Sequence, residues 1–427
     1  MTTKFSRRDF LLSGAGASLL ALSPELLAAP QGSKAKKARV VVLGGGFGGA
    51  TAAKYLKRWA PEIEVTLIER NDVFISCPQS NLVLSGGRTL AQLTTSYDGL
   101  RQKYGIRWIK DEAIAVDHGK KEVRLKRGKP VPYDRLILSP GVDFDYSALP
   151  GIADEAQRQN ILHAWKAGPQ TVALRKQLEA IPDGGIYALC IPKAPYRCPP
   201  GPYERASLVA AYFKEAKPKS KVIVLDGNPD IISKKGLFTA AWNELYPGIV
   251  DYRPNNGLLD VDPVTRTAKT EFDTVTADVL NVIPPNQAGA IAHQAGVVDS
   301  DGRWAKVDFL TYESKTVPGI HVIGDATVAA PAPKSGHVAN QQGKIAAAAI
   351  VSLLRDEKPY ELPVFSNTCY SFVSNTEAVH VAAVYRYDAA KQTIVAAEGS
   401  GVSEKRSSAE AEVASAWASN IWADALR

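Results

Sequence analysis

The sequence has 427 residues, a length that predicts two or three domains with enough apolar core to fold without disulfides or metals. It carries 51 basic and 44 acidic side chains, hence a formal net charge of +7. Because this excess is mild and no basic run is interleaved with aromatic residues, the sequence argues against nucleic-acid binding. A basic face for an acidic protein partner remains compatible with it.

The first thirty residues predict an export signal and not part of the fold. Residues 6–12 carry the twin-arginine pattern Ser-Arg-Arg-Asp-Phe-Leu-Leu, and a short apolar stretch at 11–22 follows. This stretch is too short to span a bilayer, and we expect no integral membrane segment in the mature chain. We therefore expect a twin-arginine signal at 1–30, a linker at 31–37 and a periplasmic protein, for which disulfides are permitted.

The next stretch predicts a strand, a turn, a helix and a second strand. An apolar, mostly β-branched run at 39–43 is typical of a buried strand, residues 50–59 of a helix and residues 64–69 of another strand. This order is the opening of a dinucleotide-binding unit, and we expect residues 38–150 to be the first part of an FAD-binding domain.

The turn of this unit carries the G-x-G-x-x-G spacing at Gly44, Gly46 and Gly49. The glycines allow, in turn, a tight bend, close approach of the backbone to a pyrophosphate, and packing of helix on strand. Glu69, at the tip of the second strand, is placed to accept a hydrogen bond from a ribose hydroxyl. Cys77 follows in the next loop.

A second unit of this kind is predicted within residues 151–285, with a strand at 186–191, a helix at 203–217 and a strand at 221–226 that ends in Asp226. Its turn, however, contains prolines where glycines are needed. Since proline has no N–H to donate to a pyrophosphate, we expect this unit to have lost its NAD site.

Residues 286–357 return to the first domain. There an apolar strand ends in Gly324-Asp325, and Lys334 precedes a long alanine-rich helix at 338–354, whose N-terminus favours negative charge. Residues 358–427 predict a third, mixed region with strands within 362–386 and a helix at 409–426. We assign the two tryptophans of that helix, Trp417 and Trp422, to packing.

The four cysteines are Cys77, Cys190, Cys198 and Cys369. No C-x-x-C-H motif or zinc spacing occurs and the six histidines are scattered, so we expect neither a c-type haem nor a metal site. Cys190 lies in an apolar strand and is most simply a core residue. We expect Cys198 and Cys369 in turns, and Cys198 near a helix N-terminus that lowers its thiol pKa. These two form either a structural staple or a redox pair.

The chain resembles the flavoprotein subunit of flavocytochrome c sulfide dehydrogenase over nearly all of its mature length. The most specific segments are residues 197–207 (Arg-Cys-Pro-Pro-Gly-Pro-Tyr-Glu-Arg-Ala-Ser), 321–326, 333–336 and 367–371. The resemblance implies an α/β fold with two dinucleotide-binding, Rossmann-like domains of the disulfide-reductase flavoprotein type, followed by a C-terminal mixed α+β domain.

The resemblance also implies the site. FAD is bound, with Cys77 matching the cysteine that is joined covalently to the flavin. Cys198 and Cys369 match a disulfide beside the flavin, and Glu204 matches a candidate proton acceptor. Cys190 takes no role from the family. Hydrosulfide attacks the disulfide, two electrons pass to FAD, and a separate c-type cytochrome subunit accepts them in a heterodimer.

Three other functions stay open. A sulfide:quinone oxidoreductase has a similar fold and cysteines, but the export signal and the lack of a strongly apolar terminal helix argue against it. A non-catalytic flavin-binding protein predicts no bleaching of the flavin by sulfide. A pyridine-nucleotide disulfide reductase needs NADH binding, which the proline-filled turn disfavours.

Overall fold

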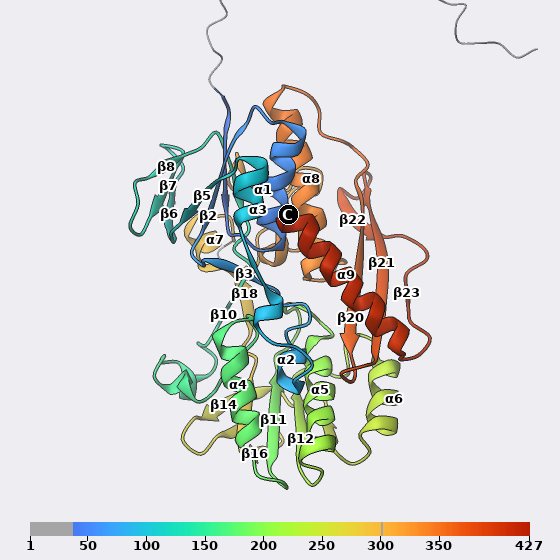
Figure 1. The fold of residues 1–427 in the computed structure, drawn as a ribbon. Helices are drawn as coiled ribbons and strands as arrows, with labels where there is room; N and C mark the ends of the chain where they lie inside the picture. Colours follow the sequence, from blue (N-terminus) through green and yellow to red (C-terminus); the bar gives the residue numbers. More distant parts are fainter. Residues whose placement is uncertain (1–36, 300–301) are drawn as a thin grey trace, which may run out of the picture. The chain divides into compact units, whose positions relative to one another are not determined.

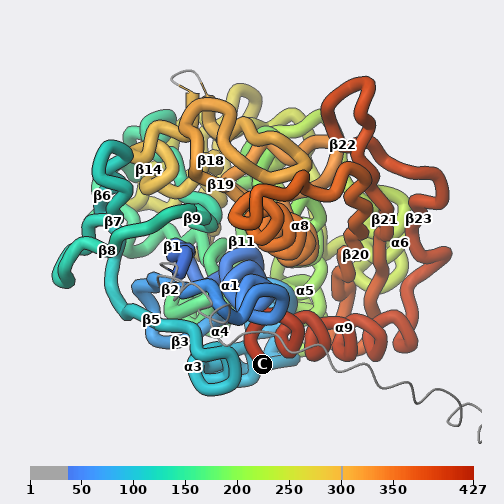
Figure 2. The backbone as a smooth tube through the Cα atoms, turned by 90° about the horizontal axis from the view of Figure 1, so that it is seen from above, coloured from blue at the N-terminus to red at the C-terminus, as the bar shows by residue number. Residues whose placement is uncertain are grey.

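The computed structural model describes residues 37–299 and 302–427. The predicted export signal and nearly all of the linker lie outside the described residues. The first sheet has five parallel strands in the order β19-β9-β1-β2-β5; Figure 1 labels β2 and β5, and Figure 2 labels every strand of this sheet. These strands are β19 (Ile320–Val322), β9 (Arg135–Leu138), β1 (Arg39–Leu43), β2 (Glu64–Glu69) and β5 (Arg107–Lys110). β1 is central and buried on both faces, which explains its unbroken run of Val and Leu.

Two helices, α1 (Phe47–Trp59) and α8 (Gly336–Leu354), pack side by side against this sheet, as Figure 2 shows from above. Their close approach depends on Gly343, where a Cβ would lie 2.5 Å from the carbonyl oxygen of Gly48. Both helices begin at the end of the sheet where the carboxyl ends of β1 and β19 lie. α1 begins three residues earlier than the sequence pattern predicts, because Gly46 serves as its N-cap.

The second dinucleotide-like unit has a four-stranded parallel sheet in the order β13-β12-β11-β17. Its strands and helices are β11 (Ile186–Ile191), β12 (Lys221–Asp226), β13 (Val250–Arg253), β17 (Val279–Val282), α4 (Pro169–Ala180), α5 (Gly201–Ala216) and α6 (Lys235–Leu245). The strands predicted at 186–191 and 221–226 are confirmed residue for residue.

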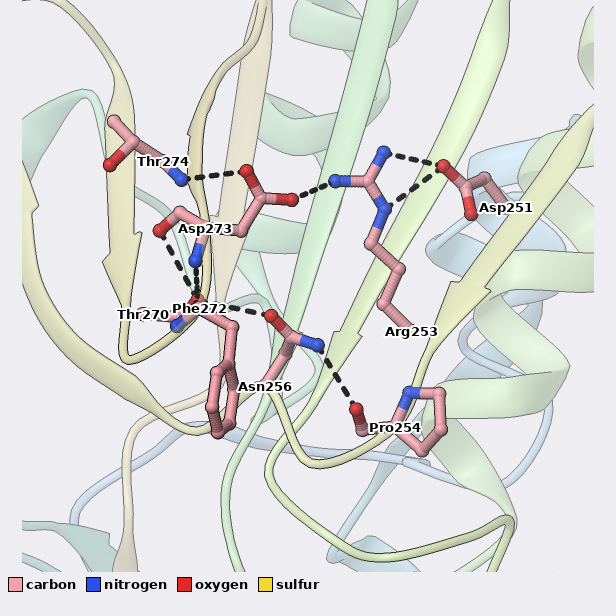
Figure 3. Close-up of polar contacts among 8 residues, drawn as sticks. All are labelled: Asp251, Arg253, Pro254, Asn256, Thr270, Phe272, Asp273 and Thr274. Carbon is pink, nitrogen blue, oxygen red and sulfur yellow. Dashed lines mark hydrogen bonds and ion pairs between the residues drawn. The ribbon is translucent and has the colours of Figure 1, made fainter.

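A three-stranded antiparallel sheet joins the end of this unit: β14 (Leu258–Asp262), β15 (Thr267–Thr270) and β16 (Thr274–Thr276). Figure 3 shows how it is tied to β13. The Arg253 guanidinium donates to Asp251 and to Asp273, and Asn256 accepts from the Thr270 hydroxyl at 3.0 Å. These contacts fix the loop that follows β13.

The C-terminal region forms an antiparallel sheet and the final helix: β20 (Val364–Phe372), β21 (Ala378–Asp388), β22 (Thr393–Ala396), β23 (Gly401–Val402) and α9 (Ser408–Leu426). The expected turn at Cys369 is wrong. β20 pairs with β21 along its whole length, and Cys369 lies inside this ladder opposite Val381.

Helix α9 runs from this sheet to α1 (Figure 1). The ammonium of Lys54 on α1 donates to the carbonyl oxygens of Ala423 at 3.1 Å and Asp424 at 2.8 Å. Since the last carbonyls of a helix have no partner within the helix, this buried lysine satisfies the end of α9 and fixes it to the first domain.

Short elements complete the described fold: β3 (Val73–Ile75), β4 (Thr94–Ser96), β6 (Ala113–Asp117), β7 (Glu122–Leu125), β8 (Val131–Pro132), β10 (Val142–Phe144), β18 (Asn286–Ala288), α2 (Leu82–Ser85), α3 (Asp98–Tyr104), α7 (Ala290–Gln294), and 3₁₀ turns at Ala91–Leu93, Pro150–Ile152, Gln157–Gln159 and Gly324–Ala326. No helix among residues 37–299 and 302–427 is long and apolar enough to cross a bilayer. The residue limits of the expected domains stay predictions.

Candidate active site

Two adjoining cavities of about 220 and 350 Å³ lie where the first sheet, α5 and β20 meet. The residues common to both linings are Gly46, Ile75, Cys77, Ser139, Gly141, Arg197 and Asp325. Five of these seven lie outside helices and strands, where functional side chains concentrate at the ends of parallel strands. One cavity continues to the dinucleotide turn and the other to the paired cysteines, so the two together form one elongated site.

The dinucleotide turn has the geometry that the glycine spacing predicts. Gly44 adopts φ +95°, and a Cβ there would lie 2.3 Å from the carbonyl oxygen of Ser139. A Cβ at Gly49 would lie 1.9 Å from the carbonyl oxygen of Gly44, whereas at Gly46 it would point into open space. The N-terminus of α1 carries no side-chain cap and no acid in its first turn. Gly46 and the free N–H groups of α1 therefore fit a pyrophosphate.

Glu69 lies at the rim of the same cavity. Its carboxylate accepts from the Gly45 N–H at 2.7 Å and from the amide of Asn71 at 2.6 Å. These bonds hold the side chain in one orientation. Oε1 also accepts from the backbone N–H of Asn71, so the lone pair left for a ribose hydroxyl is on Oε2.

Asp325 fits the cofactor most directly. It is buried in the lining of both cavities, and its Oδ1 atom has no hydrogen-bond partner in the described part of the chain. Burial raises the pKa of this carboxyl. A buried acceptor without a partner is costly, and a ribityl hydroxyl would satisfy it. Gly324 precedes it at φ +76°, and the N-terminus of α8 lines the same cavity through Gly336.

Lys334 lies behind the cavity wall and does not line either cavity. Its ammonium donates to the carbonyl oxygens of Asp325 at 3.0 Å and of Thr327, and lies 3.6 Å from the ring centre of Trp304. Burial lowers its pKa to about 7. The backbone carbonyl of Lys334 also accepts from the N–H of Cys198 at 2.8 Å, so this residue joins the Asp325 turn to the cysteine turn.

Cys77 lies at the junction of the two cavities. Its sulfur accepts a hydrogen bond from Nη1 of Arg197 at 3.0 Å, while Nε of Arg197 has no partner among the described residues. Arg197 thus fixes the position of the Cys77 sulfur. In the sequence Arg197 stands out only by its position next to Cys198.

Cys198 and Cys369 are brought together from residues 171 positions apart in the chain, and their thiols hydrogen-bond to each other. Cys198 precedes α5 in a left-handed conformation with φ +57°. Space for its sulfur comes from Gly201, where a Cβ would lie 2.9 Å from it. Both cysteines line the cavity of about 220 Å³, together with Cys77. The structure holds all four cysteines as free thiols.

The expected low pKa of Cys198 is wrong. Its thiol donates to Cys369, and this bond together with burial and the nearby Glu204 holds the pKa of Cys198 well above its usual value, against the effect of Arg197. The hydrogen bond from Cys198 lowers the pKa of Cys369. The helix N-terminus therefore lowers the pKa of Cys198 by less than Cys369, burial and Glu204 together raise it.

Glu204 lies on the first turn of α5 in the same cavity lining. Its carboxylate accepts from the N–H of Phe372 and from Nδ2 of Asn81, each at 2.8 Å. Burial raises the pKa of this carboxyl, and the two hydrogen bonds oppose the rise. A carboxylate with a raised pKa beside a thiol pair is suited to accept a proton.

Three cavity residues were missed or misjudged from the sequence. Asn81 bridges two charged groups, since it donates to Glu204 and accepts from Nε of Arg205 at 3.1 Å. Arg205 is buried and donates its remaining N–H groups to neutral oxygens, including Asn281 Oδ1 at 2.8 Å. Trp417, assigned to packing, in fact lines the cavity next to Tyr370, with ring centres 5.8 Å apart. Asn81 and Trp417 lie outside the motifs of the sequence, whereas Arg205 lies within the segment 197–207.

The acid at the ribose position of the second unit is already occupied by hydrogen bonds within the protein. The carboxylate of Asp226, fully buried, accepts from the hydroxyls of Tyr203 at 2.8 Å and Tyr252 at 2.9 Å and from the amide of Asn228 at 2.7 Å. It has no oxygen turned to solvent for a ribose, which agrees with the proline-filled turn.

Three family descriptions match the chain. Residues 38–176 match the pyridine nucleotide-disulphide oxidoreductases, residues 171–284 the central part of the sulfide dehydrogenase [flavocytochrome c] flavoprotein chain, and residues 361–426 the flavin-binding part of flavocytochrome c sulphide dehydrogenase. A sulfide dehydrogenase [flavocytochrome c] flavoprotein chain of Chlorobaculum thiosulfatiphilum is 60% identical over 45 residues, which are 10% of this chain and 94% of that sequence. The mitochondrial sulfide:quinone oxidoreductase of Mus musculus is 26% identical over 322 residues, 71% of this chain and 69% of that protein.

The chain belongs to the sulfide dehydrogenase and sulfide:quinone oxidoreductase type of flavoproteins.

Solved structures agree with this family on the fold. The sulfide:quinone oxidoreductase from Aquifex aeolicus superposes with a TM-score of 0.72 at 19% identity, covering 91% of each chain. Putidaredoxin reductase in its covalent complex with putidaredoxin gives a TM-score of 0.63 at 18% identity over 81% of each chain. The predicted fold class, with Rossmann-type units of the disulfide-reductase flavoprotein kind, is confirmed. Flavin-binding domains also indicate FAD as the cofactor, in agreement with the fit of the cavity residues.

Proposed function

We propose that this protein oxidises hydrosulfide through a redox disulfide of Cys198 and Cys369 and a bound FAD, and passes the electrons to a c-type cytochrome in the periplasm. The observation that carries the proposal is that Cys198, Cys369, Glu204 and Cys77 line one cavity with Asp325. The family relationship to sulfide dehydrogenases and sulfide:quinone oxidoreductases supports sulfide as the substrate.

The protein's own residues account for the chemistry on sulfur. Hydrosulfide attacks one sulfur of the oxidised pair, the S–S bond breaks, and a persulfide and a thiolate result. The persulfide proton passes to Glu204, which is a stronger base than an ordinary carboxylate because burial raises its pKa. FAD, when bound, supplies a two-electron acceptor that can release its electrons singly. The enclosing wall of Trp417 and Phe372 limits water at the sulfurs.

The covalent attachment of FAD to Cys77 is part of the proposal. Cys77 lines both cavities, and its sulfur accepts a hydrogen bond from Nη1 of Arg197. We expect Cys77→Ser to leave the flavin extractable by acid or denaturant, whereas Cys190→Ser, in the core of the second unit, leaves it attached. Flavin fluorescence of the denatured chain on a gel measures this. Attached flavin in Cys77→Ser would rule out this cysteine as the tether.

The activity is tested by the visible spectrum of the oxidised flavoprotein before and after anaerobic addition of sulfide. Prompt bleaching of the flavin band in the wild type, and its loss in Cys198→Ser, is the expected result. A flavin that sulfide does not bleach favours a non-catalytic flavin-binding protein and overturns the proposal.

The electron acceptor distinguishes this function from a sulfide:quinone oxidoreductase. The twin-arginine pattern and the two flavocytochrome c matches, which together cover the second unit and the C-terminal region, favour a cytochrome subunit in a heterodimer. The relatives in the mouse and in Aquifex aeolicus favour a quinone. After sulfide reduction, the rates of re-oxidation by a c-type cytochrome and by a soluble quinone are compared. Faster re-oxidation by the quinone refutes the cytochrome.

A further inference from the structure

A buried lysine from the second dinucleotide-like unit lies beside the cysteine pair. Lys234, the residue before α6, is 7% exposed and has φ +57°. Its ammonium donates to the backbone carbonyl oxygen of Cys369 at 2.9 Å and to the hydroxyl of Ser371 at 2.7 Å. The side chain therefore reaches out of its own unit and ends against β20, next to the reactive cysteine.

Burial lowers the pKa of Lys234, since the described part of the chain offers no counter-ion in contact with the ammonium. Within the described residues, no carboxylate lies within 4.0 Å of its nitrogen, and both of its hydrogen-bond acceptors are neutral. The ring of Phe238 lies 5.8 Å away and adds a weak cation–π contact. Burying a charge without a partner costs several kcal/mol, so such a residue points to an anion that forms during the reaction.

The ionisable groups around Lys234 come from every element packed on it. They are Cys369 and Cys198, then Glu204 from α5 and Glu410 from α9, of which Glu410 is already hydrogen-bonded to His380. Glu204 acts on both sulfurs, and each sulfur has one cation near it: Arg197 near Cys198 and Lys234 near Cys369. Arg197 already donates to the sulfur of Cys77, whereas both acceptors of Lys234 are neutral. The cation without an ionisable hydrogen-bond partner is therefore the one beside Cys369.

We propose that Lys234 sets the direction in which the Cys198–Cys369 disulfide opens, so that hydrosulfide attacks the sulfur of Cys198 and Cys369 leaves as a thiolate beside the lysine ammonium. The proposal rests on the proposed function. In this step a bond forms between the hydrosulfide sulfur and Cys198, and the electron pair of the broken disulfide goes to Cys369. The charge of hydrosulfide is thus transferred to Cys369, and the persulfide on Cys198 keeps the proton until Glu204 accepts it. Lys234 is a positioning residue, because it acts on the leaving sulfur and not on the substrate.

The direct test maps the persulfide in the wild-type holoenzyme. The oxidised protein receives one equivalent of sulfide under anaerobic conditions, is quenched and alkylated within milliseconds, and its peptides are weighed. The extra sulfur is expected on the peptide with Cys198. A persulfide on Cys369 overturns the proposal, and this measurement needs no variant that must fold.

The second test measures the thiolate directly and needs no sulfide. In the dithiothreitol-reduced holoenzyme, the pH dependence of alkylation at Cys369 gives its apparent pKa. Lys234→Met removes the charge at similar length and is expected to raise this pKa by about one pH unit or more. Lys234→Arg keeps the charge and should restore a value near the wild type. Lys235→Met, which removes the neighbouring lysine that pairs with Asp230, is the matched control and should change nothing.

The outcomes separate this inference from the proposed function. An unchanged Cys369 pKa in Lys234→Met refutes the role of the lysine even where sulfide bleaches the flavin. A raised pKa in a protein that sulfide does not reduce supports the electrostatic role of Lys234 and refutes sulfide as its substrate.

Discussion

Substitution of Asn81 by Leu provides a sharp test of Glu204 as the proton acceptor. Asn81 is 7% exposed and donates to Oε2 of Glu204 at 2.8 Å, while its own oxygen accepts from Nε of Arg205 at 3.1 Å. Leucine has nearly the same size and makes neither bond. The substitution therefore removes one of the two hydrogen bonds that stabilise the Glu204 carboxylate and leaves a donor of Arg205 unpaired.

The expected size follows from these bonds. A hydrogen bond to a charged group is worth about 1.5–3 kcal/mol, which corresponds to about 1–2 pKa units. Burial already raises the pKa of Glu204 above its usual value, and loss of the Asn81 bond raises it further. Because a proton acceptor must be ionised, the rate of sulfide oxidation falls as the pH falls through this pKa. The acid limb should therefore move upward by about one pH unit. With Arg205 also unpaired, the free energy of unfolding should fall by about 3–5 kcal/mol.

The assay is the rate of flavin reduction by sulfide in stopped flow between pH 5 and 9, in wild type, Asn81→Leu and Glu204→Gln. The control is Asn375→Leu, which removes an exposed asparagine whose Oδ1 accepts only from Ser85. The pH profile of Glu204→Gln should lack the acid limb that the ionisation of Glu204 produces. An acid limb in Asn81→Leu that coincides with the wild type refutes the assignment of Glu204. The double variant Asn81→Leu/Glu204→Gln also tests the assignment. If its acid limb shifts further than that of Asn81→Leu alone, Glu204 is refuted as the titrating group.

Other expectations concern the fold around the site. Gly49→Ala places a Cβ 1.9 Å from the carbonyl oxygen of Gly44, so the purified protein should retain little FAD. A ratio of flavin to protein near that of the wild type would count against the pyrophosphate turn. Burial raises the pKa of Cys190 to about 12, so iodoacetamide at pH 8 should leave Cys190 unmodified in the folded protein; its rapid alkylation would mean that the second unit opens in solution. Burial lowers the pKa of His321 to about 4 from 6.5, so the unfolded chain binds the proton first as the pH falls. Stability should therefore decrease from pH 7 to pH 5 by about 2 kcal/mol through this residue, and urea unfolding of His321→Gln should show a pH dependence smaller by that amount.

Much of the first dinucleotide unit could be predicted from the sequence because local geometry and chemistry determine it. The spacing of Gly44, Gly46 and Gly49 encodes a turn that only glycine can make, and the β-branched run at 39–43 encodes a strand buried on both faces. The prolines after Cys190 likewise have no N–H to donate, whatever the tertiary structure around them. These inferences depend on neighbours in the chain, and so they needed no tertiary structure.

The roles of the charged groups around the sulfurs depended on the tertiary structure alone. Cys198 was expected to have a lowered thiol pKa because it precedes a helix, but the thiol–thiol hydrogen bond, burial and Glu204 raise it. Lys234 reaches Cys369 from 135 residues away, and Trp417 reaches the cavity from the last helix. A charge acts through space on whichever group the fold places beside it, and no spacing in the sequence encodes that neighbour. For this protein the sequence predicted the dinucleotide turn and singled out the cysteines that line the cavity, and the tertiary structure placed Lys234, the residue before α6, beside Cys369 on β20.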